Sequence, residues 1–513
     1  MVRLPYGISN IKQLINEGYY LVDKTKFIEV LENRDEPYLF FLRPRRYGKS
    51  LWISILQHYY GIEHQQSFQN LFGKTYIGQN PTPKAHSYHV LSLEFSRINT
   101  TTEQGTFNGF LKNVRLGVQE FLMRYPMLIS AAAQEKILNQ EEPGLIVQFL
   151  FLECSGLQLY VLIDEYDHFA NEVMAFNFDS FTKFVSRNGF VRKFYEAIKQ
   201  ATGTGVVQRL FATGVTPITL DSLTSGFNIA ANVSLEEELH PMLGFTEAEV
   251  EILLSKVYEE GTLEQRQTVM DTLRAWYNGY CFNGDVQERL YNPDMVLYFL
   301  KTFSKSRKYP ESLMDSNVTT DYGKVQRLFS LKNAQQNRWV LQKLLQEGHI
   351  LAQITQQFSF EKEFTPDDFV SLLFYMGFLT IESSGLGQKR MRMPNYVIKG
   401  LYEDFFIQSI KQELGLPFEA VDVRGMVIQL AQENDPRPFL GLIETTLKAL
   451  SNRDSQGLNE KHIKALFVGF MMLTRIYFVK SEPEYGKKYP DVLLLYGPPY
   501  YPTYHFMFEL KYL

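Results

Sequence analysis

Residues 43–50 read Arg-Pro-Arg-Arg-Tyr-Gly-Lys-Ser, between an apolar run at residues 38–42 and an apolar helical pattern at residues 51–56. A strand, a short turn and a helix in this order form the context in which a backbone loop binds phosphate. The N–H groups of the turn and the positive end of the helix then surround the phosphate oxygens. This stretch therefore predicts a phosphate-binding loop.

The residues of this loop have distinct expected roles. Lys49 is expected to reach the β- and γ-phosphates, and the hydroxyl of Ser50 to ligate Mg²⁺. The general pattern G-x-x-x-x-G-K-[ST] begins with glycine, whereas this chain has Arg43 at that position, so an accidental Gly-Lys-Ser sequence is the alternative. The candidate nucleotide-binding residues are Arg45, Arg46, Tyr47, Gly48, Lys49, Ser50 and Leu51.

A second element, Leu-Tyr-Val-Leu-Ile-Asp-Glu at residues 159–165, is an apolar run that ends in two carboxylates. Such a run is typical of a strand buried on both faces, and its carboxyl end lies where open α/β sheets bind ligands. Asp164 is expected to hold Mg²⁺ and Glu165 to orient or deprotonate the attacking water. The alternative is that both acids only begin the next helix. Together, the two elements predict binding of a nucleoside triphosphate.

Two further apolar runs, at residues 90–95 and 208–215, are expected to be strands of the same sheet. Alternating strands and helices through residues 36–220 predict an α/β fold with a parallel sheet covered by helices on both faces. Thr213, near the end of the last run, is a candidate sensor of the γ-phosphate. The alternative is that this strand simply ends at a Thr-Gly turn.

The composition limits the class of protein. A chain of 513 residues is expected to form about two to four domains, and a net charge of −5 argues against unspecific coating of nucleic acid. Only Cys154 and Cys281 occur, which favours a reducing compartment without a disulfide framework or a zinc site. The longest apolar zones, 144–163 and 463–479, contain charged residues. We therefore expect a cytoplasmic protein with no membrane span.

Residues 364–410 combine a helix, a strand and a basic segment, which suggests a small winged-helix-like unit. Such units bind DNA or protein partners. The alternative is that these elements only pack within the chain.

The last fifty residues carry a second chemical pattern. A helix at 458–473 is followed by three expected strands, at 476–482, 490–495 and 505–511. An aspartate on one strand and Glu-x-Lys on the next would bring two carboxylates and an ammonium group together, because residues two apart on a strand share a face.

This arrangement suits Mg²⁺-dependent hydrolysis of phosphodiesters. Asp491 and Glu509 are the expected metal ligands, Glu460 is a further metal contact, and Lys511 would position or activate water. The alternative is an exposed Glu-Lys pair at a strand edge, which is common.

The chain resembles a bacterial and archaeal family of AAA-ATPase-like proteins fused to a nuclease domain of the PD-(D/E)XK superfamily. The resemblance covers nearly the whole chain and preserves the family order of the blocks. The blocks that carry it are LPYGI (4–8), LVDKT (21–25), FLRPRRYGKSL (41–51), VLIDEYD (161–167), FATGV (211–215), WYNGYCF (276–282), YNP (291–293), MPN (393–395), SEPEYGKKYPDVLLL (481–495) and FELKY (508–512).

The resemblance implies four regions: an AAA-like P-loop ATPase domain at residues 1–235, a helical lid at 236–310, a winged-helix-like connector at 311–415 and a restriction-endonuclease-like α/β domain at 416–513. The Arg-Pro-Arg-Arg sequence before Gly48 is typical of the family, which explains Arg43.

Carried over by position, the resemblance assigns the ATPase residues Lys49, Ser50, Asp164 and Glu165 and the nuclease residues Glu460, Glu484, Asp491, Glu509 and Lys511. Two departures concern the nuclease region. The family often has a Gly-Arg pair shortly before its aspartate, where this chain has Lys488-Tyr489. The superfamily fold usually continues with a helix and a strand, whereas this sequence ends two residues after Lys511, so the nuclease domain is expected to be truncated, split or inactive.

The sequence thus predicts an ATP-binding, Mg²⁺-dependent ATPase coupled to a nuclease-like domain that acts on DNA or RNA, with a homo-oligomer as a further expectation. Arg45 or Arg46 would stabilise transition-state charge or contact a partner; alternatively, both only pair with nearby acids. A different class of function also remains open: a non-catalytic, ATP-dependent interaction protein with a degenerate nuclease domain.

Overall fold

The computed structural model of the chain describes residues 2–96, 98–170, 189–217, 229–315, 334–358, 364–414, 420–451, 460–474, 476–481, 490–496, 500 and 502–511. It forms two compact units. The first unit consists of Met1–Glu260, Tyr280–Leu297 and Ala352–Lys389. The second unit consists of Gly261–Gly279, Tyr298–Leu351 and Arg390–Leu513.

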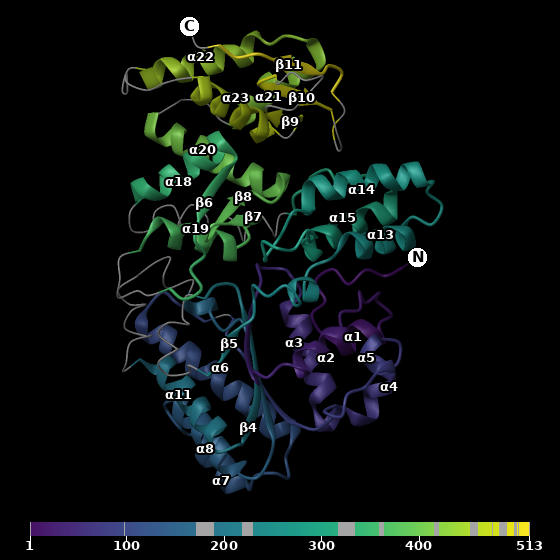
Figure 1. The fold of residues 1–513 in the computed structure, drawn as a ribbon, viewed down its shortest axis with the longest axis vertical. Coiled ribbons are helices and arrows are strands. Elements are labelled where there is room, and N and C mark those ends of the chain that lie inside the picture. The colour runs from purple at the N-terminus through teal and green to yellow at the C-terminus, as the bar shows by residue number, and fades with distance from the viewer. Residues whose placement is uncertain are drawn as a thin grey trace. The chain divides into compact units, whose positions relative to one another are not determined.

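A five-stranded parallel sheet forms the centre of the first unit, with the order β2-β3-β4-β1-β5. Figure 1 shows α6, α8 and α11 on one side of this sheet and α2 and α3 on the other. The predicted parallel sheet with helices on both faces is therefore confirmed. The strands are β1 (Tyr38–Leu42), β2 (His89–Glu94), β3 (Leu159–Asp164), β4 (Val207–Gly214) and β5 (Ala231–Asn232).

The buried strands explain why the sheet forms at these positions. Every residue of β3 is buried, as expected for a central parallel strand that is covered on both faces. Helix α3 (Lys49–Tyr60) follows the loop after β1 and buries Trp52, Leu56 and Tyr59 in the core beside the sheet. The first turn of α3 is thereby fixed at the carboxyl edge of the sheet.

The remaining helices of the first unit cover the sheet or extend from it. A capping box begins α13 (Glu247–Val257), because the Thr246 hydroxyl accepts from Glu249 N while the Glu249 side chain accepts from Thr246 N. These helices are α1 (Ile11–Asn16), α2 (Lys26–Glu32), α4 (Phe68–Phe72), α5 (Tyr76–Gln79), α6 (Glu103–Arg124), α7 (Ala131–Leu138), α8 (Pro143–Glu153), α11 (Phe190–Gly203), α13 (Glu247–Val257) and α19 (Pro366–Tyr375).

The second unit contains an antiparallel sheet of order β11-β10-β9, packed with α21, α22 and α23 around one apolar core. The predicted C-terminal helix and three strands are confirmed, with bounds that differ by a few residues. The elements are α14 (Leu263–Tyr277), α18 (Ala334–Glu347), α20 (Tyr396–Leu414), α21 (Ala420–Glu433), α22 (Arg437–Ser451), α23 (Glu460–Thr474), β9 (Phe478–Ser481), β10 (Val492–Leu495) and β11 (Phe506–Phe508).

A third sheet, of order β6-β8-β7, lies with α19 in the region expected to resemble a winged helix. Its strands are β6 (His349–Ala352), β7 (Thr380–Gly385) and β8 (Gln388–Arg392). Two helices, α15 (Pro293–Ser306) and α18, precede these strands in the chain. None of the described helices is long and apolar enough to cross a membrane.

Candidate functional site

The loop after β1 has the backbone of a phosphate-binding turn. Gly48 caps α3 with φ 86°, a left-handed conformation that glycine adopts without strain. Lys49 is the first residue of the helix, and its Nζ donates to the carbonyl oxygens of Arg43 at 3.0 Å and Pro44 at 2.9 Å. The ammonium group therefore lies inside the curve of the loop, where it can exchange these carbonyls for phosphate oxygens.

The environment of Lys49 has opposing effects on its charge. Burial lowers the pKa of Lys49, and the nearby carboxylates of Glu165 and Asp164 act against this shift. Lys49 and the two acids of the Leu-Tyr-Val-Leu-Ile-Asp-Glu run are thus brought together, as the sequence predicted, although they lie far apart in the chain.

Ser50 and Asp164 line the same groove. Burial raises the pKa of Asp164 to about 6, and a hydrogen bond from the Ser50 hydroxyl acts against this shift. A hydroxyl and a carboxylate are hard oxygen ligands, and Mg²⁺ in nucleotide sites typically takes only one or two protein ligands beside phosphate oxygens. These two residues therefore fit Mg²⁺. Within the described residues, no group of three or more His, Cys, Asp or Glu could hold a metal ion by itself.

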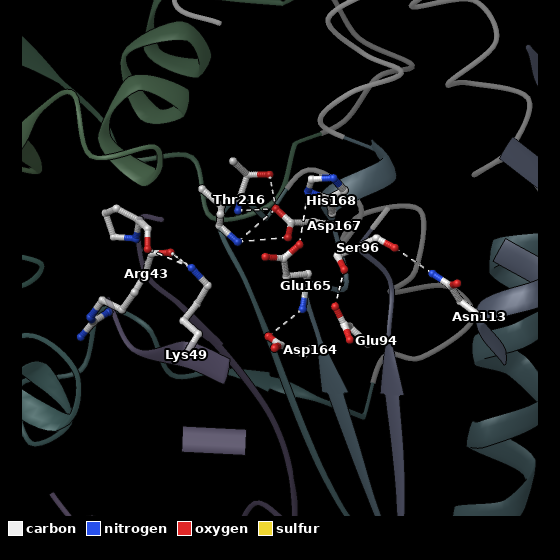
Figure 2. A network of polar contacts seen from close by, with 12 residues as sticks. Arg43, Lys49, Glu94, Ser96, Asn113, Asp164, Glu165, Asp167, His168 and Thr216 are labelled. Carbon is white, nitrogen blue, oxygen red and sulfur yellow. Dashed lines mark hydrogen bonds and ion pairs between the residues drawn. The ribbon is translucent and has the colours of Figure 1, made fainter. Parts of the chain in front are cut away.

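Glu165 lies in the tight turn that follows β3. Its φ is 51°, which is unusual for a residue other than glycine, and its N–H donates to Asp164 Oδ1 at 2.9 Å. Its Oε2 lies 3.3 Å from Nδ1 of His168 (Figure 2). The carboxylate of Glu165 is thus oriented by a partner one turn further along the chain.

Asp167 was given no role by the sequence, yet it joins two loops of the site. Its buried carboxylate accepts from Val215 N at 3.0 Å, from Thr216 N at 2.6 Å and from the Thr216 hydroxyl at 2.8 Å (Figure 2). The hydroxyl of Tyr166 donates to Thr216 O at 2.6 Å. The turn after β3 is therefore fixed to the turn after β4. The only signal in the sequence was the last residue of the Val-Leu-Ile-Asp-Glu-Tyr-Asp block.

Arg43, at the position of the missing glycine, points away from the phosphate side. Its guanidinium group is fully buried and donates to the carbonyl oxygens of Ser234 at 2.7 Å and of Leu239 and His240 at 3.2 Å. Burial lowers the pKa of Arg43 to about 9, so the group stays protonated at neutral pH. The side chain thus ties the loop to the segment after β5. Sequence reasoning saw only a departure from the glycine pattern.

Tyr47 also attaches the loop to the rest of the first unit through its side chain. Its buried ring meets Tyr280 and Phe282 edge to face, at centroid distances of 5.5 and 5.6 Å. The aromatic block around residue 280 is therefore part of the wall that supports the phosphate loop.

Two arginines of the loop contact residues 292–294. Arg46 forms an ion pair with Asp294 at 3.1 Å, and Asn292 Nδ2 donates to Arg45 O at 3.4 Å. For Arg46, the structure shows the pairing with a nearby acid that was the alternative to a role in transition-state charge. The Tyr-Asn-Pro block at residues 291–293 is thus placed beside the loop.

Leu51 and Thr213 lie deeper in the protein. Leu51 is partly buried and packs against the core. Thr213 is fully buried on β4, and its hydroxyl donates to Phe41 O of β1 at 2.9 Å. The hydroxyl thus joins two neighbouring strands, and its role as a γ-phosphate sensor stays a prediction.

The C-terminal candidates lie at one end of the antiparallel sheet. Val492 of β10 pairs with Phe508 of β11, so Asp491 and Glu509 are the next residues at the same end of the two strands. Asp491 Oδ2 accepts from Leu510 N at 2.7 Å. Glu509 and Lys511 are exposed. Glu460 is the first residue of α23, and Glu484 lies outside the described residues.

Comparison with known proteins confirms the resemblance at both ends of the chain. Residues 5–224 match the family model described as "Predicted AAA-ATPase", and residues 458–513 match the PD-(D/E)XK nuclease superfamily. The chain therefore joins an AAA-ATPase-like domain of the nucleotide-binding type to a domain of this nuclease superfamily.

The proteins similar to the chain include a bacterial relative and an archaeal protein of known structure. A protein of Azotobacter chroococcum mcd 1, described as an uncharacterized protein in the vnfD 5′ region, is 27% identical over 315 residues, which cover 58% of this chain and 52% of that protein. The chain thus spans about half the length of this curated relative. A Walker-type ATPase of Pyrococcus abyssi has 11% identity and a TM-score of 0.41, over 74% of this chain and 94% of the other.

Proposed function

We propose that the protein hydrolyses ATP with Mg²⁺ and that this cycle controls a nuclease-like domain acting on nucleic acid. The observation that carries the proposal is that Ser50 and Asp164 line one groove and that the carboxylate of Asp164 lies close enough to act on the charge of Lys49. A lysine, a hydroxyl and a buried carboxylate at the carboxyl end of a parallel sheet are the groups that bind a nucleoside triphosphate and its metal.

Each residue of the loop has a defined task in this proposal. The N–H groups of residues 45–50 and the positive end of α3 bind the phosphates, and Lys49 exchanges its two carbonyl partners for phosphate oxygens. Ser50 and Asp164 would hold Mg²⁺, which neutralises charge on the phosphates when it is bound. Arg43 and Tyr47 hold the loop in the conformation that binds phosphate.

The test is to measure Mg·ATP binding by calorimetry, and release of inorganic phosphate, for the wild type and Lys49→Ala. We expect affinity to fall by about 10- to 100-fold, the size of one lost charge-assisted contact, together with loss of turnover. Lys193→Ala, which removes an exposed lysine of α11, should behave like the wild type. Unchanged ATP affinity in Lys49→Ala would refute the proposal.

Binding of ATP without turnover, and without cleavage of nucleic acid, would favour the other class of function: an interaction protein that uses ATP as a structural ligand.

We also propose the four regions at residues 1–235, 236–310, 311–415 and 416–513 as functional parts. Cleavage of nucleic acid is a second proposed activity, supported by the common position of Asp491 and Glu509 at one end of β10 and β11.

A further inference from the structure

Arg43 and Pro44, which begin the phosphate loop, are held on two sides. Their carbonyl oxygens accept from Lys49 Nζ, at 3.0 Å for Arg43 and 2.9 Å for Pro44 (Figure 2). Their side chains contact Phe282 and Gly377, which lie far along the chain in the same compact unit. The loop is therefore bound to Lys49 through its backbone and to distant segments through its side chains.

The ring of Pro44 occupies the space that a side chain at residue 377 would need. Gly377 follows α19, has φ 84°, and its N–H donates to Phe374 O at 2.9 Å. A Cβ placed on Gly377 would lie 2.8 Å from Cβ and 3.0 Å from Cγ of Pro44, well inside the optimal separation of about 3.5–4.0 Å between carbon atoms. The phosphate loop is therefore in close contact with the end of α19.

A second contact with α19 passes through Phe282. Its ring centre lies 4.1 Å from the guanidinium carbon of Arg43 and 6.0 Å from the ring centre of Phe374 in α19. The neighbouring Cys281 N donates to the hydroxyl of Thr380, the first residue of β7, at 2.7 Å. The loop is thus attached at two points to α19 and β7, which belong to the region expected to resemble a winged helix.

Lys49 has two possible sets of partners, and they differ in their effect on the loop. While its ammonium group binds the carbonyl oxygens of Arg43 and Pro44, the backbone of the loop is restrained. A phosphate group that binds the ammonium group instead removes both restraints, whereas the contacts with Phe282 and Gly377 remain. Because a ligand favours the arrangement that it binds better, phosphate shifts the loop towards the arrangement without these restraints.

We propose that nucleotide binding is coupled to α19 and β7 through the contact of Pro44 with Gly377, an inference that rests on the proposed ATPase function. Binding of ATP changes how Pro44 packs against the end of α19. Conversely, a partner that binds α19 or β7 changes the affinity for ATP by the same factor, because coupling between two sites is reciprocal. The winged-helix-like region is thereby a regulatory element of the ATP site.

The experiment compares Gly377→Ala with Gly387→Ala, in the turn between β7 and β8. Both glycines have a left-handed backbone, with φ 84° and 78°, so both variants carry a similar backbone strain. The added methyl group meets Pro44 at residue 377, whereas no atom of the described residues lies within 4 Å of a Cβ at residue 387. We expect Mg·ATP affinity, measured by calorimetry, to fall about 10-fold in Gly377→Ala, a usual size for coupled sites, and to stay unchanged in Gly387→Ala.

Hydrogen exchange of the wild type tests the coupling without any substitution. It is measured with and without Mg²⁺ and a non-hydrolysable ATP analogue. The N–H groups of Gly377 and Phe378 donate to the carbonyl oxygens of the last turn of α19, so their exchange reports on this turn. We expect the analogue to change their exchange rates and to leave the turn at Gly387 unchanged.

Two results would overturn the inference. One is an ATP affinity of Gly377→Ala equal to that of Gly387→Ala. The other is wild-type exchange at residues 377–378 that does not respond to a bound analogue. In both cases nucleotide binding itself stands, and only the coupling is refuted. Wild type that does not bind ATP would refute both the coupling and the proposed function.

Discussion

The guanidinium carbon of Arg43 lies 4.1 Å from the ring centre of Phe282 and 4.2 Å from the ring centre of Phe41. The cation thus contacts two aromatic rings, while its N–H groups donate to the carbonyl oxygens of the segment after β5. Stacking and multiple donation are properties that arginine combines and lysine does not. The phosphate loop is therefore attached to the core through the side chain of its first residue.

Arg43→Met is expected to destabilise the protein by about 3 kcal/mol or more, because buried carbonyl oxygens lose their donors and the stacked cation is removed. The measurement is the free energy of unfolding in urea. Arg437→Met removes an exposed arginine and serves as the control. An unfolding midpoint equal to that of the wild type would contradict the structural role of Arg43.

Asp167→Asn is expected to weaken the connection between the turns after β3 and β4. An amide offers one acceptor oxygen where the carboxylate accepts from Val215 N and from both groups of Thr216, and its NH₂ would face N–H donors. We expect a loss of about 1–3 kcal/mol in unfolding free energy and a lower kcat. Asp271→Asn, at an exposed site of α14, should change neither quantity.

Because Glu403 is buried, we expect the unfolding free energy of the second unit to depend on pH. Burial raises the pKa of Glu403 to about 8, with the charge of Lys399 acting in the opposite direction. An unfolded glutamate has a pKa of about 4.3, so between these values the folded state binds more protons than the unfolded state. The stability contributed by neutral Glu403 is complete below the unfolded pKa and is lost as the pH rises to about 8.

The variant Glu403→Gln tests this dependence, because it keeps the shape without the charge. Relative to the wild type, it should gain stability between about pH 5 and about pH 8, by up to about 1.4 kcal/mol per pH unit. Urea unfolding at both pH values measures the difference. Glu433→Gln, at an exposed site, should show no such trend. An equal offset at both pH values would count against a buried neutral Glu403.

Asp491→Ala is expected to abolish Mg²⁺-dependent nicking of plasmid DNA, if the wild type shows it, and to leave ATP affinity unchanged. Asp491 lies at the same end of the sheet as Glu509 and accepts from Leu510 N, so its removal eliminates a proposed metal ligand and loosens the strand end. Glu444→Ala, on the exposed face of α22, is the matched control. Nicking that survives in Asp491→Ala would assign the cleavage to another site or a contaminant.

Much of the first unit could be predicted from local patterns. The apolar run at residues 38–42 forms β1 with the predicted bounds, and the run ending at Asp164 forms β3. Gly48 has the left-handed backbone that a tight turn before a helix needs. These features depend on residues that are neighbours in the chain, and periodicity and turn chemistry describe such neighbours well.

The sequence by itself thus determined that a strand, a glycine turn and a helix carry Lys49 and Ser50, and that a buried strand ends in Asp164. Only the tertiary structure decided that β2 lies beside β3, which places Glu94 opposite Asp164. It also decided that Asp167 binds Thr216 and that Arg43 points into the core. The physical reason is that strand order and buried polar contacts join distant segments, and no local pattern specifies which partners burial will bring together.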